Sequence, residues 1–216
     1  YTVSGQNSNN SVRIDNAFFH RLDADGLWEL KRRTDGKVSK VVVVSRDMRS
    51  HSVPLAAELK RGLRARGIEV IDIGIADTPQ NYFAIGHLGA SGGIQVTASH
   101  NPSVYNGFKM SRRDAIPVSY ETGIAELERL VRESAVASDL QPLAGEVQRD
   151  VFADYTAHVL SMMEHLQPRL KLAADAANGM GTLYLPILER LNVELVPLYF
   201  SLDGSFPNHE ANPLKP

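Results

Sequence analysis

The chain has 216 residues, a formal net charge of -2 and 43% hydrophobic residues, a balance typical of a soluble globular protein. At about 100–200 residues per domain, this length allows one large or two modest domains whose cores need neither disulfides nor a structural metal. The absence of cysteine excludes disulfides, thiolate zinc sites and cysteine nucleophiles, and it favours a cytoplasmic protein.

Charge and hydropathy patterning narrow the possible partners. No apolar run approaches the ~18–20 residues of a membrane span, and the start of the chain has no signal-peptide pattern, so no membrane partner is expected. Between Leu30 and Arg66, eleven basic residues face three acidic ones, a net charge of +8. Such a segment can attract phosphate or nucleic acid, but without interleaved aromatic residues it is typical of the solvated faces of helices. We therefore expect no nucleic-acid partner.

Strands and helices alternate through the first part of the chain. The first sixteen residues show no periodicity and are expected to form a loop, whereas the β-branched run Val41–Val44 is typical of a strand buried on both faces. Strands are predicted over Val41–Val44, Glu69–Ile73 and Gly93–Thr97, and helices over Phe18–Lys31, 54–66 and Gln80–Leu88. This alternation predicts an α/β domain with a mostly parallel sheet flanked by helices.

The pattern lapses and then resumes. A helix is expected around Ile124–Val131, and the stretch Ala135–Glu146, which contains Pro142 and Gly145, reads as a linker. We expect residues 1–140 to form the first domain and residues 147–216 a partial second α/β domain. Its predicted elements are a helix over Val151–Leu166, a strand over Lys171–Ala174, a helix over Leu183–Leu191, a strand over Val193–Tyr199 and a loop over Ser201–Pro216.

A polar segment directly after the third predicted strand could carry chemistry. Open α/β sheets bind ligands at the carboxyl ends of their strands, which is where Thr97–Pro102 would emerge. Ser99 offers a nucleophile or phosphate carrier, His100 a proton donor or acceptor, Asn101 a means of holding the loop and Lys109 a point charge for phosphate. From residue types alone, an ordinary turn is the preferred interpretation, because Asn, Pro, Ser and Gly are the usual turn formers.

Two rival chemistries fit the sequence poorly. A serine-hydrolase nucleophile elbow needs Gly two residues on either side of the serine, where this chain has Thr97 and Asn101. Gly179 and Gly181 could begin a dinucleotide-binding loop, but Tyr184 stands where the third Gly would be. A tight turn is therefore the preferred interpretation of that Gly pair. His209 is interpreted as a solvated loop histidine, and Asp23, Asp25 and Asp175 are too scattered to predict a metal site.

The motifs resemble those of the α-D-phosphohexomutases, the phosphomannomutase and phosphoglucomutase family. The resemblance is carried by the following segments: Thr97–Pro102 with Asn106–Lys109, Arg46–Arg49, Gly67–Gly74 with Thr78 and Pro79, Asp175 with Asn178–Gly181, and Asp203, Gly204, Phe206–His209 and Pro213. It extends from about Val41 to Pro216.

The resemblance implies a mechanism and a set of site residues. Ser99 would carry a phosphoryl group between the 1- and 6-positions of a hexose phosphate, mannose or glucose, through a bisphosphate intermediate. His100 and Lys109 would be catalytic with it, and Thr97, Asn101, Asn106 and Gly107 would form the substrate and phosphate loop. Mg²⁺ would bind an oxygen of the phosphate on Ser99, with its remaining ligands beyond Pro216.

This chain differs from the family pattern at its N-terminus and in its length. Only Arg13 could stand in for the family's N-terminal site arginine, and Ser45 stands where the family commonly has Gly. The metal, sugar and second phosphate loops would all lie beyond Pro216, so we expect an N-terminal fragment that is inactive alone. The alternative is a non-catalytic α/β binding domain or a catalytically lost remnant of the family. Oligomeric state and the choice of hexose are left open.

Overall fold

The computed structural model describes residues 40–134, 140–163 and 170–214. The helix expected over Phe18–Lys31, the N-terminal loop and Arg13 lie outside these residues. Within the described ranges, no helix is long and apolar enough to cross a membrane.

The first unit is built on a five-stranded sheet with the order β4-β3-β1-β2-β5. β1 pairs in parallel with both β2 and β3, β5 extends the parallel part beyond β2, and β4 runs antiparallel to β3. The strands are β1 (Lys40–Arg46), β2 (Ile68–Ile75), β3 (Gly92–Val96), β4 (Phe108–Arg112) and β5 (Glu146–Gln148). The predicted α/β class with a mostly parallel sheet is confirmed.

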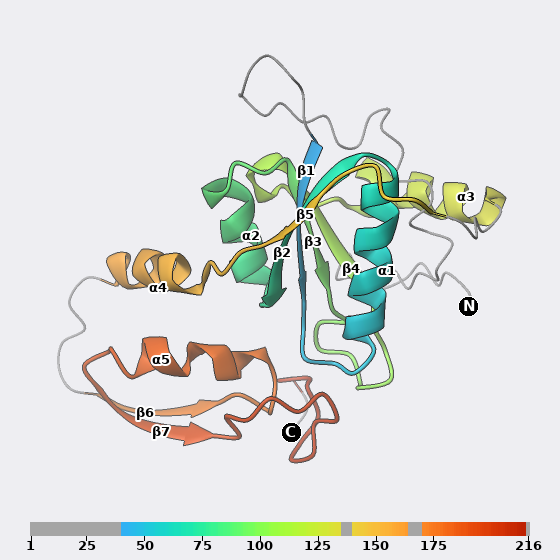
Figure 1. Ribbon diagram of the computed structural model, residues 1–216. Coiled ribbons are helices and arrows are strands. Elements are labelled where there is room, and N and C mark those ends of the chain that lie inside the picture. The colour runs from blue at the N-terminus through green and yellow to red at the C-terminus, as the bar shows by residue number, and fades with distance from the viewer. Residues whose placement is uncertain (1–39, 135–139, 164–169, 215–216) are drawn as a thin grey trace.

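Helices cover both faces of this sheet, as Figure 1 shows. α1 (Ser52–Ala65) and α3 (Ala125–Glu133) lie on one face, and α2 (Thr78–His87) lies on the other. Because successive strand residues point to opposite faces, Val42 and Val44 pack toward α1, while Val41 and Val43 pack toward α2. The unbroken valine run therefore follows from burial on both faces.

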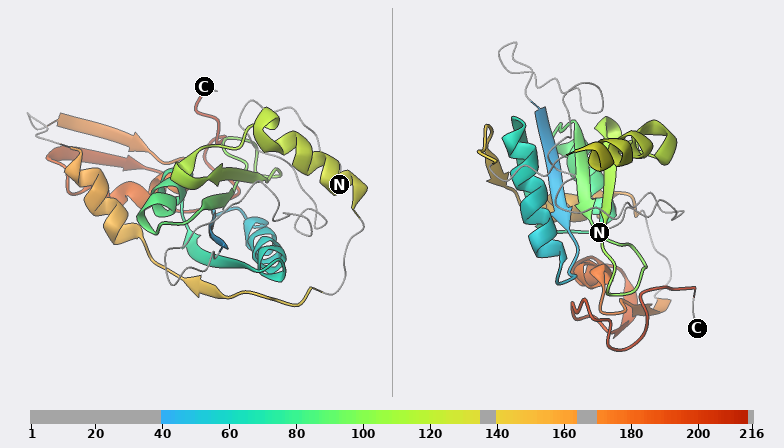
Figure 2. Two further views of the ribbon diagram at one scale, coloured as in Figure 1. Left: turned by 90° about the horizontal axis from the view of Figure 1, so that it is seen from above. Right: turned by 90° about the vertical axis from the view of Figure 1, so that its right-hand side faces the viewer.

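The second unit lies at the end of the sheet where β1 and β3 finish (Figure 1 and Figure 2, right). It contains two parallel strands, β6 (Leu170–Asp175) and β7 (Val193–Leu198), with the short helix α5 (Leu185–Leu188). α4 (Phe152–Ser161) follows β5 in the chain and contacts α2 of the first unit.

Several element boundaries were predicted wrongly. β5 begins at Glu146, the last residue of the expected linker, and Glu146 and Val147 extend the sheet beside Val70 and Ile71. α4 ends at Ser161, short of the predicted Leu166. Of the predicted Leu183–Leu191 helix, only Leu185–Leu188 is the α-helix α5, which follows a 3₁₀ turn over Met180–Tyr184. The division of the chain at residues 140 and 147 stays a prediction.

Candidate active site

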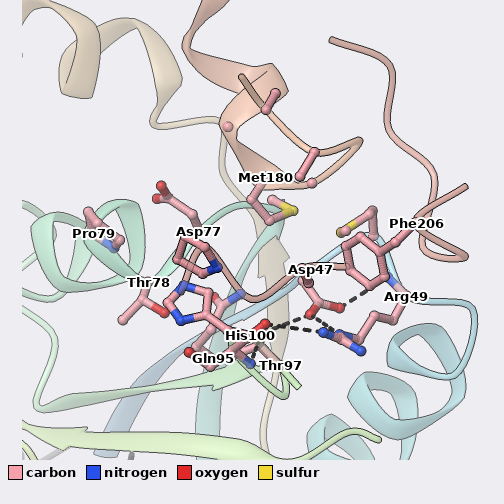
Figure 3. Close-up of a pocket in the computed structure, with 18 of the residues that line it drawn as sticks. Asp47, Arg49, Asp77, Thr78, Pro79, Gln95, Thr97, His100, Met180 and Phe206 are labelled. Carbon is pink, nitrogen blue, oxygen red and sulfur yellow. Dashed lines mark hydrogen bonds and ion pairs between the residues drawn. The ribbon is translucent and has the colours of Figure 1, made fainter. Parts of the chain in front are cut away.

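A cavity of about 450 Å³ lies between the carboxyl ends of the first sheet and the second unit. Figure 3 shows Met180 of the second unit on one side and Asp77, Thr97 and His100 of the first unit on the other. Residues following β1, β2, β3 and β6 all contribute to its lining, which includes Asp47, Arg49, Asp77, Thr78, Gln95, Thr97, Ser99, His100, Lys109, Asp175, Gly179, Met180, Gly181 and Phe206.

Ser99 sits at this cavity in a left-handed backbone conformation, with φ of 55°. The Lys109 ammonium donates a hydrogen bond of 3.4 Å to the Ser99 hydroxyl. Ser99 is part-buried and His100, its neighbour, is exposed. The structure thus brings together Ser99, His100 and Lys109, which were the predicted catalytic residues. A non-glycine residue in this conformation is strained, and such strain is concentrated at functional sites.

Burial affects the pKa of the Lys109 ammonium. This half-buried side chain on β4 loses hydration, and that loss lowers the pKa of its ammonium below the ordinary lysine value. A partly desolvated ammonium is a stronger electrostatic partner for an incoming phosphate than one in bulk water.

The predicted loop residues have different local roles. Thr97 lines the cavity and accepts a hydrogen bond of 3.0 Å from the Ser99 amide through its hydroxyl. Asn101, through its side-chain amide, donates a bond of 2.7 Å to the Ala98 carbonyl. Asn106 donates to the Ser52 hydroxyl at 2.8 Å, and the Gly107 carbonyl accepts from the Thr97 amide. Among these four, only Thr97 faces the cavity, and the others shape the loop.

Asp47 and Arg49 form a buried ion pair beneath the loop, with 3.1 Å between Arg49 Nε and Asp47 Oδ2. Thr97 donates its hydroxyl proton to the same carboxylate at 2.8 Å. Burial lowers the pKa of the Arg49 guanidinium, and the charge of Asp47 opposes that shift. We did not predict either residue as part of the site. The available signal was their place directly after β1, at the same sheet edge as Ser99.

Ser45, the departure from the family pattern just before this pair, is fully buried. Its hydroxyl bonds to the Gln95 side chain and accepts a bond of 2.6 Å from the Asn81 side chain. The hydroxyl is therefore satisfied, and a buried polar group with partners avoids a desolvation penalty.

A second unpredicted cluster connects the two units. The Tyr184 hydroxyl donates to Asp77 Oδ2 at 2.5 Å and lies 2.8 Å from the Tyr155 hydroxyl. Asp77 also caps α2 by accepting from the Gln80 amide at 2.9 Å. Burial raises the pKa of the Asp77 carboxyl, against the lowering effect of these hydrogen bonds. Burial likewise raises the pKa of the Tyr184 hydroxyl, so it remains a donor.

The second unit supplies the opposite wall. Gly179 and Gly181 form the expected tight turn, in which the Gly179 amide donates to the Ala176 carbonyl at 2.7 Å. His209 contacts other side chains of the second unit, so our interpretation of it as a solvated loop histidine is wrong. Its Nε2 lies 3.2 Å from the Asp175 carboxylate, and its ring packs edge-on against Tyr199.

Comparisons with known proteins cover nearly all of the chain. Residues 11–137 match the domain described as phosphoglucomutase/phosphomannomutase, alpha/beta/alpha domain I, and residues 150–216 match alpha/beta/alpha domain II of the same family.

Similar curated proteins carry names from the same family. A protein from Xanthomonas campestris named "Phosphohexose mutases" is 42% identical over 81% of this chain and 39% of its own length. Proteins named "Phosphomannomutase" from Salmonella typhimurium and Vibrio cholerae are 37% and 33% identical over 90% and 100% of this chain, respectively. The chain spans 45% and 47% of their lengths.

Solved structures agree with the sequence matches. A phosphoglucomutase/phosphomannomutase family protein from Burkholderia thailandensis superposes with a TM-score of 0.73 at 31% identity, over 94% of this chain and 45% of that chain. A structure titled as a putative phosphomannomutase from Thermus thermophilus gives 0.70 at 25% identity, over 95% of this chain and 48% of that one. With both halves of the chain matched and the fold in agreement, this chain belongs to the phosphoglucomutase/phosphomannomutase family.

Proposed function

We propose that this chain carries the phosphoserine part of a phosphohexomutase, which moves a phosphoryl group between the 1- and 6-positions of mannose or glucose phosphate. One observation above all supports this proposal. The hydroxyl of Ser99, held in a left-handed conformation, lies 3.4 Å from a partly desolvated Lys109 ammonium at the edge of a cavity. That pairing suits an oxygen that carries phosphate beside a cation that offsets its charge.

In the proposed reaction, a phosphate resides on Ser99 Oγ and a hydroxyl of the bound hexose phosphate attacks its phosphorus. The bond between phosphorus and Ser99 Oγ breaks as the bond to the sugar oxygen forms, and the hydroxyl proton passes to a base. Ser99 Oγ takes up the proton from that base, and the resulting bisphosphate reorients. Ser99 Oγ then returns the proton to the base and attacks the other phosphorus, whose bond to the sugar oxygen breaks; that oxygen takes the proton and phosphoserine is restored. Lys109 stabilises the charge on the transferring group, and His100, on the exposed side of the loop, assists proton movement.

The described residues offer Mg²⁺ only one point of attachment. Across the described ranges, no three His, Asp or Glu side chains gather closely enough to hold a metal ion. The donor set of these residues therefore fits Mg²⁺ only through a phosphate oxygen on Ser99, where the ion would offset phosphate charge. We assign no step of the reaction to the metal.

The activity is proposed for a protein longer than these 216 residues, because the chain spans less than half of the relatives named above. Transition-state stabilisation by several preorganised groups needs all of them in place. We therefore expect residues 1–216 alone to turn over no hexose phosphate. No contact among the described residues favours the alternative of a non-catalytic binding domain.

Peptide mass analysis of the complete protein, isolated from its own cells, tests the assignment. We expect phosphate on Ser99 in the wild type and in a Ser103→Ala control, which changes a serine of the same loop. We expect none in Ser99→Ala, together with loss of mutase turnover. Phosphate found at another serine, or full turnover by Ser99→Ala, would refute the proposal.

A further inference from the structure

Most hydrogen-bond donors of the Arg49 side chain bond to the backbone of the loop that carries Ser99. Its side chain is 1% exposed and enters from the turn after β1, beneath residues 99–105. A guanidinium has five N–H donors in a planar fork. Arg49 uses one of them for Asp47, through Nε at 3.1 Å.

The other four donors all point to main-chain carbonyls of one loop. Nη2 donates to the carbonyls of Asn101 at 2.7 Å and Ser99 at 3.1 Å. Nη1 donates to the carbonyls of Pro102 at 2.8 Å and Tyr105 at 3.3 Å. One side chain therefore fixes the direction of four peptide groups, including that of Ser99 itself.

The remaining contacts of Arg49 favour the same fixed position. Asp47 accepts from the Arg49 amide at 3.1 Å and from the Thr97 hydroxyl at 2.8 Å, so the ion pair is joined to the start of the loop. The ring of Phe206, from the second unit, lies 5.0 Å from the guanidinium carbon and covers one face of it. Gly204, also from the second unit, lies close against the Arg49 backbone: a Cβ on Gly204 would be only 2.9 Å from Arg49 Cα.

This arrangement differs from that of an ordinary buried ion pair in the core. Four of the donors on the Arg49 side chain bond to loop carbonyls rather than to strand or helix groups. Loss of this side chain should therefore destabilise the loop before it affects the sheet. A lysine could keep the charge opposite Asp47, but its compact ammonium has three donors and no planar fork. It could not reach four carbonyls spread over seven residues.

We propose that Arg49 is a positioning residue, which holds the loop so that Ser99 keeps its left-handed conformation and its hydroxyl stays beside Lys109. This inference rests on the proposed function for its effect on phosphoryl transfer. Arg49 itself touches neither the hydroxyl of Ser99 nor Lys109 in any contact of the described residues, so it acts through the backbone alone.

Hydrogen exchange on Arg49→Lys provides the first test, with Arg61→Lys as control because Arg61 forms an exposed ion pair with Glu58 on α1. In Arg49→Lys we expect amides of residues 99–105 to exchange at least about 10-fold faster, because opening of the loop alone is made easier. Amides of β1 and β3 should keep their wild-type rates. Unchanged loop exchange, or equal acceleration throughout the sheet, would overturn the proposal.

A double variant, Asp47→Asn with Arg49→Met, removes both buried charges and so avoids leaving one unpaired. It should fold and show the same selective loop exchange. In the complete protein, kcat of Arg49→Lys should fall about 10-fold or more while KM for the hexose phosphate changes little, as expected when the reacting group is misplaced but substrate binding is kept. Equal turnover of the variant and wild type would contradict this role.

The two proposals fail in distinguishable ways. If Ser99 never carries phosphate, the proposed function is wrong. The exchange experiment still decides whether Arg49 holds the loop, because it needs no substrate and no activity.

Discussion

Ser99 supplies a hydroxyl to the site from a backbone conformation that lowers the stability of the fold. A serine with φ of 55° is less stable there than a glycine, since only glycine adopts the left-handed region without a steric penalty. We expect Ser99→Gly to be more stable than Ser99→Ala by about 1 kcal/mol in urea unfolding. Equal stabilities would mean that the backbone at this position carries no strain. The hydroxyl is thus kept at a cost in stability.

Lys109 should also reduce stability near neutral pH. Burial lowers the pKa of its ammonium in the folded protein below the ordinary value of 10.5. The desolvation penalty is fully present while the ammonium is charged in both states, and it is relieved as pH rises through the lowered folded pKa toward 10.5.

Substitution isolates this effect. Lys109→Met should be more stable than wild type at neutral pH, and the advantage should shrink as pH rises toward the unfolded lysine pKa. Unfolding free energies of both proteins over that range provide the measurement, with the exposed Lys171→Met as control. An advantage that grows with pH would show that the ammonium is stabilised in the fold rather than desolvated.

Among the helices, α2 depends on a residue that also touches the second unit. Asp77 caps α2 and accepts the Tyr184 hydroxyl, and burial raises the pKa of its carboxyl above the ordinary 3.8. A raised folded pKa stabilises the fold below the unfolded pKa, and that stabilisation is lost as pH rises through the folded value.

Asp77→Asn keeps an N-cap acceptor but does not titrate. We expect the stability of wild type relative to this variant to fall as pH rises from 3.8 toward neutrality. Chemical unfolding of both proteins across this range measures it, with Glu189→Gln, which changes an exposed carboxyl, as the control substitution. A relative stability that instead rises with pH would mean that the two hydrogen bonds outweigh burial.

Elements with a strong sequence pattern were the ones that could be predicted. β1, β2 and β3 each carry a largely buried run that was predicted as a strand, and the place of the polar loop after β3 led to Ser99, His100 and Lys109, which line the cavity. β5 was missed because its three residues, Glu146–Gln148, form a short and largely exposed edge strand without an apolar pattern. The helix after β6 was overestimated at both ends, because a 3₁₀ turn occupies Met180–Tyr184 and α5 ends at Leu188.

Some residues of the site could likewise be predicted from the sequence, and others could not. Asp47, Arg49 and Asp77 follow β1 and β2 and could have been found by the rule that located Ser99. Tyr184 could not, because it meets Asp77 across 107 residues and a contact between two units has no local pattern. His209 was interpreted as solvated because its partner Asp175, within the same unit, lies 34 residues earlier in the chain and forms no local pattern with it.

At the scale of the whole molecule, Gly204 marks how closely the two units approach. A Cβ on Gly204 would lie 2.9 Å from Arg49 Cα and 3.0 Å from the Met48 carbonyl, both of them backbone atoms. We expect Gly204→Ala to lower the unfolding free energy by about 1–3 kcal/mol through overpacking. Thermal and urea unfolding measure this change.

Gly86 provides the matched control, because a Cβ there meets nothing within 4 Å and the residue lies inside α2. Gly86→Ala should raise stability by about 0.5–1 kcal/mol through its better helix propensity. If both substitutions had the same sign of effect, the close contact between the units would not be a constraint on stability.

The different burial of Arg49 and Lys109 has a consequence for ionic strength. Both residues line the same cavity, but Arg49 is 1% exposed and lies between loop carbonyls and Phe206, where dissolved ions screen its interactions little, whereas Lys109 is only half-buried. At about 0.15 M salt, exposed charges more than about 8 Å apart are largely screened, and salt added beyond that should weaken binding of a phosphorylated sugar at the cavity. Exchange rates of the loop amides should stay unchanged over the same salt series, so the shape of this site would be independent of salt while its attraction for anions is not.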